Sequence, residues 1–437
     1  MSGGVAQELR RMLADDQVID GLAAEPWAVC DRVPQAVAFP GSESELAGVL
    51  ERASAEGWTV APAGRATWLF AGHPPRGIDV VVSLKRLERV LEYEPADLTV
   101  TVEAGVGLDV LAARVREHRQ WLPLDPAGSP RGTLGATLGT ASWGPLEAGF
   151  GRPRDQVLGA RIVTGDGRVL ALGGRVVKNV AGFDVLRAQV GAWGTLGVLT
   201  SATVRLHPLP EADRTLLFTA PAKEELVSLA RALACAPVPV AALELMAPGE
   251  RDTGATVSVL AARLLGTRDE IEGLHRALAT TVPGAQPRLL EGEASAALFR
   301  NMAAVEDGAQ FVVRLSALPD RLGWLFEQAD RLAGLSHEAV GFGARVTAHV
   351  AAGTVRVIVA VLERSPGWVE RTITRLRRVR EELAADGGTL VITRAPPELV
   401  SDVGAWGIDP GTDPLIRGLK QHFDPAGILC PGRMEVV

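Results

Sequence analysis

Two glycine-containing stretches show the residue pattern that most clearly indicates binding chemistry. The first, PAGRAT at residues 62–67, ends a strand-like segment, and the second, GTLGATLGTASWG at residues 132–144, has four glycines among thirteen residues. Backbone N–H groups exposed in such turns form concave sites for anions, and small side chains let a pyrophosphate approach the backbone. One such stretch is more often an ordinary loop, but two in one half of the chain favour a site for a phosphate-containing ligand.

Side chains suited to general acid–base catalysis are sparse. Glu244, in the apolar segment ALELM, is the best candidate carboxylate, although a position on a solvated strand face is the favoured interpretation. The single tyrosine, Tyr93, lies in a loop-like EYEP segment, and His118 and His275 lie on charged helix faces. No catalytic residue is therefore assigned from the sequence.

Several familiar motifs are missing from the chain. It has no GxxxxGK[ST], HExxH or GxSxG, and in its nearest approach to GxGxxG, which begins at Gly105, Val110 takes the place of the third glycine. Three widely spaced cysteines without a CxxC argue against a disulfide framework or an iron–sulfur cluster bound by this chain. No metal ligands are predicted.

The bulk composition is that of a globular protein with two or three domains. The chain has 437 residues, of which 47% are hydrophobic and 22% charged, and its net charge of −7 argues against nucleic acid as a partner. The N-terminus lacks the apolar core of a secretory signal, and no apolar run reaches the roughly 18 residues of a membrane helix. We therefore expect a cytoplasmic protein without a transmembrane segment.

The elements that position the first glycine stretch are strands and helices in close succession. Ser42 and Glu45 predict a capping box for a helix over 42–57, followed by strands at 58–64, 79–84 and 98–103 and a helix at 108–118. After the second glycine stretch, RIVTGDGRVLAL predicts a hairpin around an Asp-Gly turn, and a last strand ends at the prolines near residue 210.

Composition shifts at about residue 211, where long helices begin to alternate with strand pairs. This alternation predicts an α+β domain whose sheet is covered on one face. The predicted helices span 222–234, 268–280, 293–304, 318–333 and 366–384, the predicted strands lie near 238–247, 255–263, 309–316, 345–350, 354–363 and 388–393, and a last helix spans 413–423. The chain thus divides into an N-terminal helical segment (1–32), a first domain (33–210), a second domain (211–400) and a C-terminal segment (401–437).

Several segments resemble, in chain order, the FAD-binding domain of the vanillyl-alcohol-oxidase/PCMH flavoprotein family. They are PLDPAG, GATLGTASWGP, GRPRDQVLGARIVTGDG, GGRVVKNVAGFD and GAWGTLGVLTSATVRLHPLP. VKNVAGFD (Val177–Asp184) and VGAWG (Val403–Gly407) are most similar to the E-type FAD-binding subunits of bacterial glycolate oxidase, and HFDPAGILCPGRM resembles the family's C-terminal signature. The resemblance extends from about residue 33 to the C-terminus.

The resemblance implies an α+β fold: a PCMH-type FAD-binding domain of two subdomains, then an α+β cap domain with an antiparallel sheet and helices. Residues 401–437 would return to the FAD-binding domain. The pyrophosphate of FAD would lie between 62–67 and 135–142, held by backbone, hydroxyl groups and small side chains, and 194–198 would approach adenine or flavin. The residues so assigned to FAD are Pro62, Ala63, Gly64, Arg65, Ala66, Thr67, Pro126, Gly135, Ala136, Thr137, Gly139, Thr140, Ser142, Gly194, Gly197 and Val198.

The chain departs from the family pattern at three places. The first loop has no histidine at 62–68, where covalent relatives link the flavin, so FAD is expected to be held non-covalently. Relatives resemble GGGT where this chain has Arg65 and Ala66, and Arg65 either places a cation on the pyrophosphate or obstructs it. HVAAGTVR (349–356) keeps one histidine of an HxGDGNxH-like strand but has Arg356 at the second, which favours His349 as a packed strand residue.

The function implied by the resemblance is that of an FAD-binding oxidoreductase subunit in a glycolate-oxidase-like complex that oxidises a small 2-hydroxy acid. Its partners would be a second flavoprotein subunit and an iron–sulfur subunit, which could attach it to the inner membrane face. Two alternatives stay open: a non-catalytic scaffold that has kept the fold, and a stand-alone FAD-dependent dehydrogenase of unknown substrate.

Overall fold

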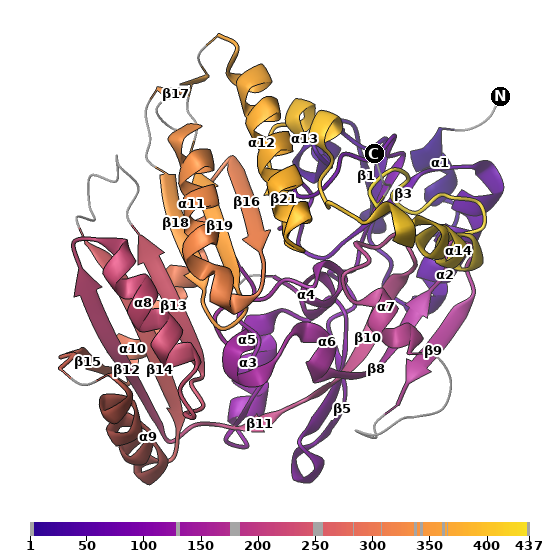
Figure 1. Ribbon diagram of the computed structural model, residues 1–437. Helices are drawn as coiled ribbons and strands as arrows, with labels where there is room; N and C mark the ends of the chain where they lie inside the picture. Colours follow the sequence, from indigo (N-terminus) through magenta and orange to yellow (C-terminus); the bar gives the residue numbers. More distant parts are fainter. Residues whose placement is uncertain are drawn as a thin grey trace. The chain divides into compact units, whose positions relative to one another are not determined.

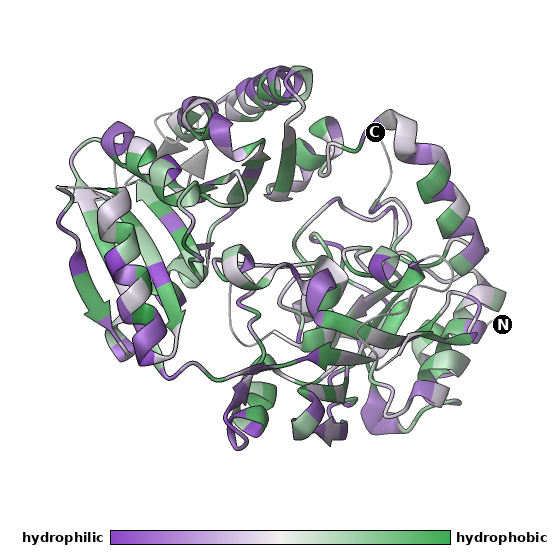
Figure 2. Ribbon diagram, turned by 60° about the horizontal axis from the view of Figure 1, so that its bottom comes forward, coloured by the Kyte–Doolittle hydropathy of each residue, from purple (hydrophilic) through white to green (hydrophobic). Residues whose placement is uncertain are grey.

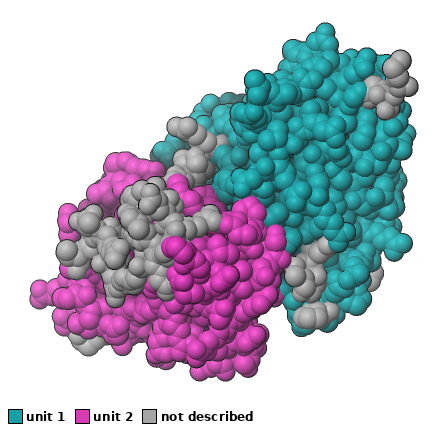
Figure 3. Space-filling model, turned by 90° about the horizontal axis from the view of Figure 1, so that it is seen from above, with its two compact units in different colours: residues 1–143, 152–209, 408–437 teal, residues 144–151, 210–407 magenta. Residues whose placement is uncertain are grey.

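The computed structural model describes residues 4–127, 132–174, 184–247, 257–282, 284–306, 308–335, 339–340, 344–360, 363–364 and 366–434. The chain forms two compact units, coloured separately in Figure 3. Unit 1 comprises residues 1–143, 152–209 and 408–437, and unit 2 comprises residues 144–151 and 210–407. The short excursion of residues 144–151 into unit 2 has no counterpart in the segments predicted from the sequence.

Unit 1 begins with a small, mainly parallel sheet. Its strand order is β1-β2-β4-β3, formed by β1 (Val18–Asp20), β2 (Ala36–Ala38), β4 (Val80–Ser83) and β3 (Val60–Ala63). Helices α1 (Val5–Leu9) and α2 (Glu43–Glu56) belong to the same part of the chain. The predicted cap of α2 is confirmed in part, since Ser42 Oγ accepts a hydrogen bond of 3.1 Å from Glu45 N.

The second sheet of unit 1 is antiparallel, with strand order β5-β6-β10-β8-β9. Its strands are β5 (Val90–Glu94), β6 (Thr99–Glu103), β10 (Val198–Arg205), β8 (Val157–Val163) and β9 (Val169–Gly173). The predicted hairpin around Asp166 is confirmed, because β8 and β9 pair from Gly159 with Gly173 to Val163 with Val169. The remaining elements of unit 1 are α3 (Leu108–Arg116), β7 (Gln120–Trp121), α4 (Leu134–Thr140), α6 (Pro153–Gln156), α7 (Val185–Gln189), β11 (His207–Pro208) and α14 (Asp413–Phe423).

One hydrophobic core joins the two sheets of unit 1. It includes Leu46 of α2, Val80 of β4, Val102 of β6 and Leu134 of α4, each with no solvent exposure. Leu429, near the C-terminus, belongs to the same core and forms a parallel bridge with Val60 of β3. The C-terminal segment is therefore part of the unit that holds the two glycine stretches.

Unit 2 is built on one eight-stranded antiparallel sheet, visible with its helices in Figure 1. The strand order is β15 (Arg288–Glu291), β12 (Ala212–Ala220), β14 (Ser258–Gly266), β13 (Ala242–Ala247), β18 (Ala344–His349), β19 (Thr354–Val359), β16 (Phe311–Ser316) and β21 (Thr389–Arg394). Other elements are α5 (Glu147–Phe150), α8 (Lys223–Ala234), α9 (Arg268–Thr281), α10 (Glu293–Ala303), α11 (Leu322–Ala333), β17 (Ala339–Val340), β20 (Glu363–Arg364), α12 (Trp368–Ala385) and α13 (Pro397–Val403).

Helices cover both faces of this sheet, so the prediction of a sheet covered on one face is wrong. Helices α8, α9, α11 and α12 pack in one large core with strand residues such as Leu243 and Ala262. Phe299 and Met302 of α10 pack instead with Ala242 and Ala261, the next residues along the same strands, which point to the opposite face. The amphipathic pattern of α10 predicts a buried face but not which side of the sheet receives it.

The predicted α+β class with an antiparallel sheet in the second part is confirmed. In Figure 2 the strands are largely green, whereas the helices alternate green and purple, as expected for amphipathic elements on sheets. Strands β1, β2, β5, β12 and β15 were not predicted, being short or without clean alternation. No described helix is both long and apolar enough to cross a membrane.

Candidate functional site

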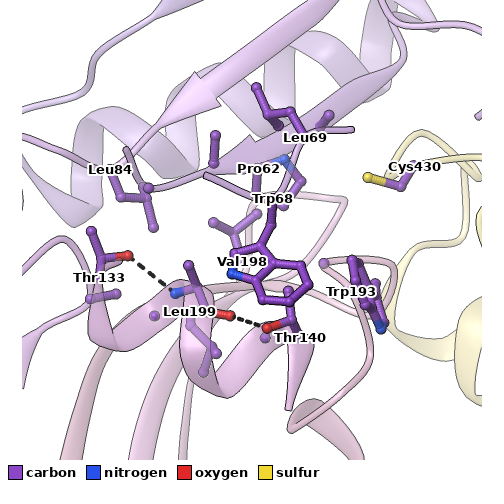
Figure 4. A pocket seen from close by; sticks show the side chains of 18 of the residues that line it. Pro62, Trp68, Leu69, Leu84, Thr133, Thr140, Trp193, Val198, Leu199 and Cys430 are labelled. Atoms are coloured by element: carbon purple, nitrogen blue, oxygen red, sulfur yellow. Dashed lines mark hydrogen bonds between the residues drawn. The ribbon is translucent and has the colours of Figure 1, made fainter. Parts of the chain in front are cut away.

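Unit 1 contains a pocket formed by three segments that lie far apart in the sequence. It holds about 800 Å³ of space free of protein atoms, part of it continuous with solvent. Its walls come from the end of β3 and the loop after it, from α4, and from the stretch between α7 and β10, with Cys430 and Arg433 added from the C-terminus (Figure 4). The lining residues include Ala61, Pro62, Ala63, Gly64, Ala66, Thr67, Trp68, Leu69, Leu84, Ala104, Thr133, Gly135, Ala136, Gly139, Thr140, Gln189, Trp193, Gly194, Gly197, Val198 and Leu199.

The second glycine stretch forms a helix in this wall, where the sequence analysis expected a loop. Thr133 Oγ1 caps helix α4 by accepting a hydrogen bond of 3.2 Å from Ala136 N. Leu134 and Leu138, four residues apart, are fully buried in the core. The residues on the pocket side of the helix are Gly, Ala and Thr, so its two faces differ in side-chain size and not in polarity. Because of this, and because of the many glycines, the helical period was not recognised in the sequence.

Three glycines of the pocket allow its walls to touch one another. A Cβ added at Gly64 would lie 2.3 Å from Thr133 Oγ1, one at Gly135 would lie 2.7 Å from Ala104 Cβ, and one at Gly194 would lie 2.2 Å from Pro62 Cγ. Side chains at these positions would force the segments apart. At Gly139, in contrast, a Cβ would meet nothing within 4 Å, so this glycine leaves open space on the pocket side of α4.

The backbone donors at the start of α4 are already used within the protein. Leu134 N donates to Val106 O at 2.9 Å, Gly135 N donates to Ala104 O at 2.8 Å, and Ala136 N donates to Thr133 Oγ1. These bonds fix α4 to the end of β6, and they use the N–H groups of Leu134, Gly135 and Ala136 within the protein. These three residues therefore contribute to the shape of the pocket, whereas backbone binding of FAD by the rest of the segment stays a prediction.

The first glycine stretch keeps its backbone donors available. No backbone N–H from Gly64 to Thr67 donates a hydrogen bond to another residue in the part of the chain that the structure describes. Ala66 has a φ of +62°, in the left-handed region, and successive N–H groups in such a turn point into one concavity. This loop is the part of the pocket suited to an anion.

Twelve of the sixteen residues assigned to FAD from the sequence line this one pocket. Arg65, Pro126, Thr137 and Ser142 are not among the lining residues. The Arg65 guanidinium lies 3.6 Å from the carboxylate of Asp109, and the hydroxyl of Thr137 donates back to Thr133 O at 3.0 Å. The contact of any of the sixteen with FAD stays a prediction. Most of the segment VKNVAGFD, residues 177–183, lies outside the described residues.

Several lining residues with large or charged side chains were not assigned to FAD from the sequence. The rings of Trp68 and Trp193 meet edge to face, with centroids 6.0 Å apart. Arg433 is 4% exposed, its guanidinium lies 5.1 Å from the Trp193 ring centre, and it donates a hydrogen bond to Ala71 O. Arg433 lies in the C-terminal signature CPGRM. The expectation that this segment returns to the FAD-binding domain could have indicated Arg433 as a site residue.

Comparison with known protein families agrees with this architecture. A family profile described as "FAD linked oxidases, C-terminal domain" matches residues 209–434, more than half of the chain, and one described as "FAD binding domain" matches residues 34–173. The chain belongs to the FAD-linked oxidases. It is therefore an oxidoreductase with FAD as its cofactor, as the sequence resemblance implied.

Several curated relatives align with this chain over only part of their own length. The chain is 33% identical to D-2-hydroxyglutarate dehydrogenase of Xanthomonas citri pv. viticola over 45% of this chain and 42% of that protein. It is 37% identical to glycolate oxidase subunit GlcE of Escherichia coli over 34% of this chain and 42% of that protein. The chain thus aligns with about two-fifths of the length of these relatives. A D-lactate dehydrogenase of Archaeoglobus fulgidus aligns over 91% of this chain and 90% of its own length, at 26% identity.

Solved structures share the fold. The chain is similar to p-cresol methylhydroxylase with substrate bound, with a TM-score of 0.77 and 17% identity, over 98% of this chain and 95% of that one. At this identity the likeness shows the fold alone.

The pocket fits a large, mainly uncharged ligand with an anionic part. Two buried polar atoms on its walls, Thr67 Oγ1 and Gln189 Nε2, have no hydrogen-bond partner among the described residues. Buried polar groups are nearly always paired, so these two atoms point to a ligand. Together with the donors at 64–67 and the cation of Arg433, they match the mixed chemistry of a dinucleotide such as FAD.

Unit 2 contains a different polar cluster, on strands near the middle of its sheet. Glu244 of β13 and His349 of β18 face each other in register, and His349 Nδ1 lies 2.6 Å from Glu244 Oε1, with both side chains 4% exposed. On the next strand, Arg356 Nη1 lies 2.8 Å from Glu306 Oε1, and Arg356 Nε donates to Thr347 Oγ1 at 3.2 Å.

These contacts correct the interpretation of Glu244 as a solvated residue. Alternation along β13 does turn Glu244 away from Leu243, but His349 lies directly opposite it on a neighbouring strand. His349 is packed in its strand, as expected. Within the described residues, no three His, Cys, Asp or Glu side chains are grouped so that they could hold a metal ion.

Proposed function

We propose that the chain is the FAD-binding subunit of a glycolate-oxidase-like complex, which oxidises a small 2-hydroxy acid, and that the unit 1 pocket holds its FAD non-covalently. The observation that supports this most directly is the convergence of three distant segments, each predicted to contact FAD, on one pocket. FAD, when bound, supplies the capacity to accept two electrons and a proton from a substrate. The protein supplies binding and orientation.

Different walls of the pocket would bind chemically different parts of FAD. The N–H groups of the loop 64–67 would hold the pyrophosphate, and Arg433 adds a positive charge to the same pocket. Helix α4 offers a flat surface of small residues against which a planar ring can lie. Among the described residues, the lining contains no histidine, and burial raises the pKa of the Cys430 thiol and so keeps it in its unreactive form. Non-covalent attachment is the binding mode that agrees with this lining.

The substrate class and the partners are proposed from the relatives. Their names include 2-hydroxy-acid dehydrogenases, and one is a subunit of glycolate oxidase. The three cysteines include no CxxC, so electrons leaving through an iron–sulfur cluster would need another chain. We expect a second flavoprotein subunit to perform the oxidation of the substrate.

The absorption spectrum of the purified full-length chain tests this proposal. We expect flavin bands in the visible region, released as intact FAD by heat or acid because the bond is not covalent. The chain is then mixed anaerobically with glycolate or D-lactate, alone and after co-expression with its candidate partner subunits. Bleaching in the complex but not with the chain alone supports the subunit; a chain that stays colourless after addition of FAD refutes the proposal in favour of a scaffold.

A second candidate, a stand-alone dehydrogenase, is favoured by the Glu244–His349 pair. A carboxylate bound to one imidazole nitrogen fixes the tautomer and orientation of the ring, which is an arrangement used for proton transfer. If the chain alone bleaches with a 2-hydroxy acid, Glu244→Gln and His349→Asn should each abolish bleaching while FAD stays bound. Bleaching that survives both substitutions would exclude this pair as the acid–base group.

A further inference from the structure

Gln189 is a buried polar residue at a position where the fold gives its carboxamide nothing to bind. It is the last residue of α7, it lines the unit 1 pocket, and it is 2% exposed. Its Nε2 has no hydrogen-bond partner in the part of the chain that the structure describes. Leaving a buried amide donor unpaired costs free energy, so its retention points to a ligand that pairs with it.

The surroundings of this carboxamide indicate which part of a ligand lies there. A Cβ added at Gly197 would lie 3.2 Å from Ile162 Cδ1 and 3.4 Å from Gln189 Oε1, so the carboxamide and an apolar side chain flank the same glycine. Val198 and Leu199 continue the lining with apolar groups. Such a surface suits a flat aromatic ring better than a phosphate, whose donors the loop 64–67 already offers.

A carboxamide presents one donor and one acceptor side by side, and this pattern matches the edge of a nitrogen heterocycle. Gln and Asn recognise adenine in this way through its ring nitrogen and its amino group. The pyrimidine edge of the flavin ring, with alternating N–H and C=O groups, offers the same complementary pattern. FAD contains both edges, whereas a phosphate oxygen offers only acceptors.

We propose that the Gln189 carboxamide recognises a donor–acceptor heterocycle edge of FAD and so contributes to the affinity and selectivity of the pocket. This inference rests on the proposed FAD site in unit 1. It assigns to Gln189 a contact that neither the glycine spacing nor the resemblance indicated. The adenine edge and the flavin edge are the two possible sources, and fragments of the cofactor distinguish them.

The test compares Gln189→Leu with the wild-type chain by titrating FAD, ADP and FMN into the apoprotein and measuring the dissociation constants. We expect Gln189→Leu to raise the dissociation constant for FAD at least tenfold, because the pocket loses a donor and an acceptor that pair with the ligand. A matching loss for ADP with FMN unchanged identifies the adenine edge. A matching loss for FMN with ADP unchanged, accompanied by a shift of the bound flavin spectrum, identifies the flavin edge.

The stability of the apoprotein separates a ligand contact from a structural one. Gln189→Leu removes an unpaired buried donor, so the melting temperature of the apoprotein should stay the same or rise. Gln120 is the matched control: it is also buried in unit 1, but its Nε2 donates to Pro95 O at 2.7 Å and its Oε1 accepts from Tyr93 at 2.9 Å, and it does not line the pocket. Gln120→Leu should therefore lower the apoprotein melting temperature and leave the FAD dissociation constant unchanged.

Two results would overturn the inference. One is an FAD dissociation constant for Gln189→Leu within twofold of the wild type, and the other is a drop in apoprotein melting temperature as large as that of Gln120→Leu. Failure of the proposed function looks different, since in that case the wild-type chain itself takes up no FAD. The variant Gln189→Glu keeps the shape of the side chain but loses the amide donor, so it should raise the FAD dissociation constant as Gln189→Leu does.

Discussion

The unit 1 pocket and the polar strands of unit 2 are built on opposite principles. The pocket is formed by backbone, glycines and small side chains, and its binding capacity lies in shape and in N–H groups that the fold leaves unpaired. In unit 2, buried carboxylates are paired with basic side chains, as in Glu244–His349 and Glu306–Arg356. One region offers unpaired donors to a ligand, whereas the other pairs its buried carboxylates within the protein.

This difference has an energetic consequence. Substitutions at pocket positions that face open space, such as Gly139, should change ligand affinity with little effect on the folding of the apoprotein. Substitutions in the polar strands should change stability with little effect on FAD, because removing one partner leaves a buried charge without compensation. Mutations in the pocket should therefore change FAD affinity, whereas mutations in the polar strands should change the free energy of unfolding.

The largest effect is expected for Glu306→Gln. It leaves the Arg356 guanidinium, only 5% exposed, without the carboxylate at 2.8 Å, and breaking a buried ion pair in this way typically costs about 3–5 kcal/mol. The free energy of unfolding, measured by urea denaturation, should fall by that amount. The dissociation constant for FAD should stay within twofold of the wild type.

Two controls define this result. Asp386→Asn breaks an exposed pair of unit 2, Arg321–Asp386, whose side chains are each 44% exposed, and should cost about 1 kcal/mol or less. The double variant Glu306→Leu/Arg356→Met removes both charges and should recover most of the lost stability. Equal losses for Glu306→Gln and Asp386→Asn would contradict the view that burial makes the first pair critical.

The next effect is expected for Gly139→Leu, which places a side chain where a Cβ meets no protein atom within 4 Å. The leucine would occupy the space on the pocket side of α4, so FAD affinity should fall at least a hundredfold, roughly 3 kcal/mol. Leucine favours helix more than glycine does, so the apoprotein should keep or gain stability. Titration of FAD and thermal melting of the apoprotein measure the two quantities.

Gly135 provides the contrast within the same helix. From the sequence, Gly135 and Gly139 are both assigned to FAD without distinction. In the structure, a Cβ at Gly135 would meet Ala104 Cβ at 2.7 Å, so even Gly135→Ala should destabilise the apoprotein, whereas Gly139→Ala should not. If Gly139→Ala destabilised the apoprotein as much as Gly135→Ala, the distinction between packing glycines and pocket glycines would be wrong.

The same contrast explains what the sequence could and could not predict. Helices with clean periodicity, such as α8 and α14, were found within a residue or two because their patterns are local. The turn of the β8–β9 hairpin was also placed correctly, although β8 begins at Val157, four residues before the predicted segment. The pocket was found for a related reason, since shape-based binding requires small residues close together in the chain. Helix α4 was missed because its buried face consists of two leucines among glycines.

Contacts between distant residues leave no such pattern. Glu244 and His349 are 105 residues apart, and their pairing depends on strand order in a sheet whose topology the spacing does not reveal. Gln189 resembled any polar residue at a helix end, and only the burial of its carboxamide against the pocket distinguishes it. The sequence therefore predicted the region that binds by backbone and size better than the region organised by charge.

A moderate effect is expected for His349→Leu. The substitution removes the group 2.6 Å from the buried Glu244 carboxylate, and the loss of a buried hydrogen-bonded partner should lower the free energy of unfolding by about 2 kcal/mol. Glu244→Gln, which keeps an acceptor for the imidazole, should cost less. Urea denaturation measures both, and a FAD affinity that fell along with stability would show that the two regions are not independent.

The smallest effect concerns Glu43, a charged contact in unit 1 outside the pocket, and tests whether charge pairs there also contribute to stability. Glu43 lies in the first turn of α2; Arg161 Nη2 of β8 lies 2.7 Å from its carboxylate, and Thr200 Oγ1 of β10 donates to it at 2.6 Å. Burial alone would raise the pKa of Glu43, but the hydrogen bonds from Arg161 and Thr200 and the charge of Arg161 lower it below its usual 4.5. Because the folded state then binds its proton less readily than the unfolded state, the contribution is complete above pH 4.5 and is lost as the pH falls below it.

Glu43→Gln should accordingly lower the free energy of unfolding by about 1 kcal/mol at pH 7, as expected for a partly exposed pair. The difference between variant and wild type should shrink when urea denaturation is repeated at pH 5, 4 and 3.5, because the wild-type carboxylate becomes protonated on unfolding. FAD affinity at pH 7 should not change, since Glu43 does not line the pocket. A difference that stayed constant or grew towards acid pH would mean that the carboxylate charge does not provide the stabilisation. The contrast between the ligand pocket and the charged structural contacts would then not extend to unit 1.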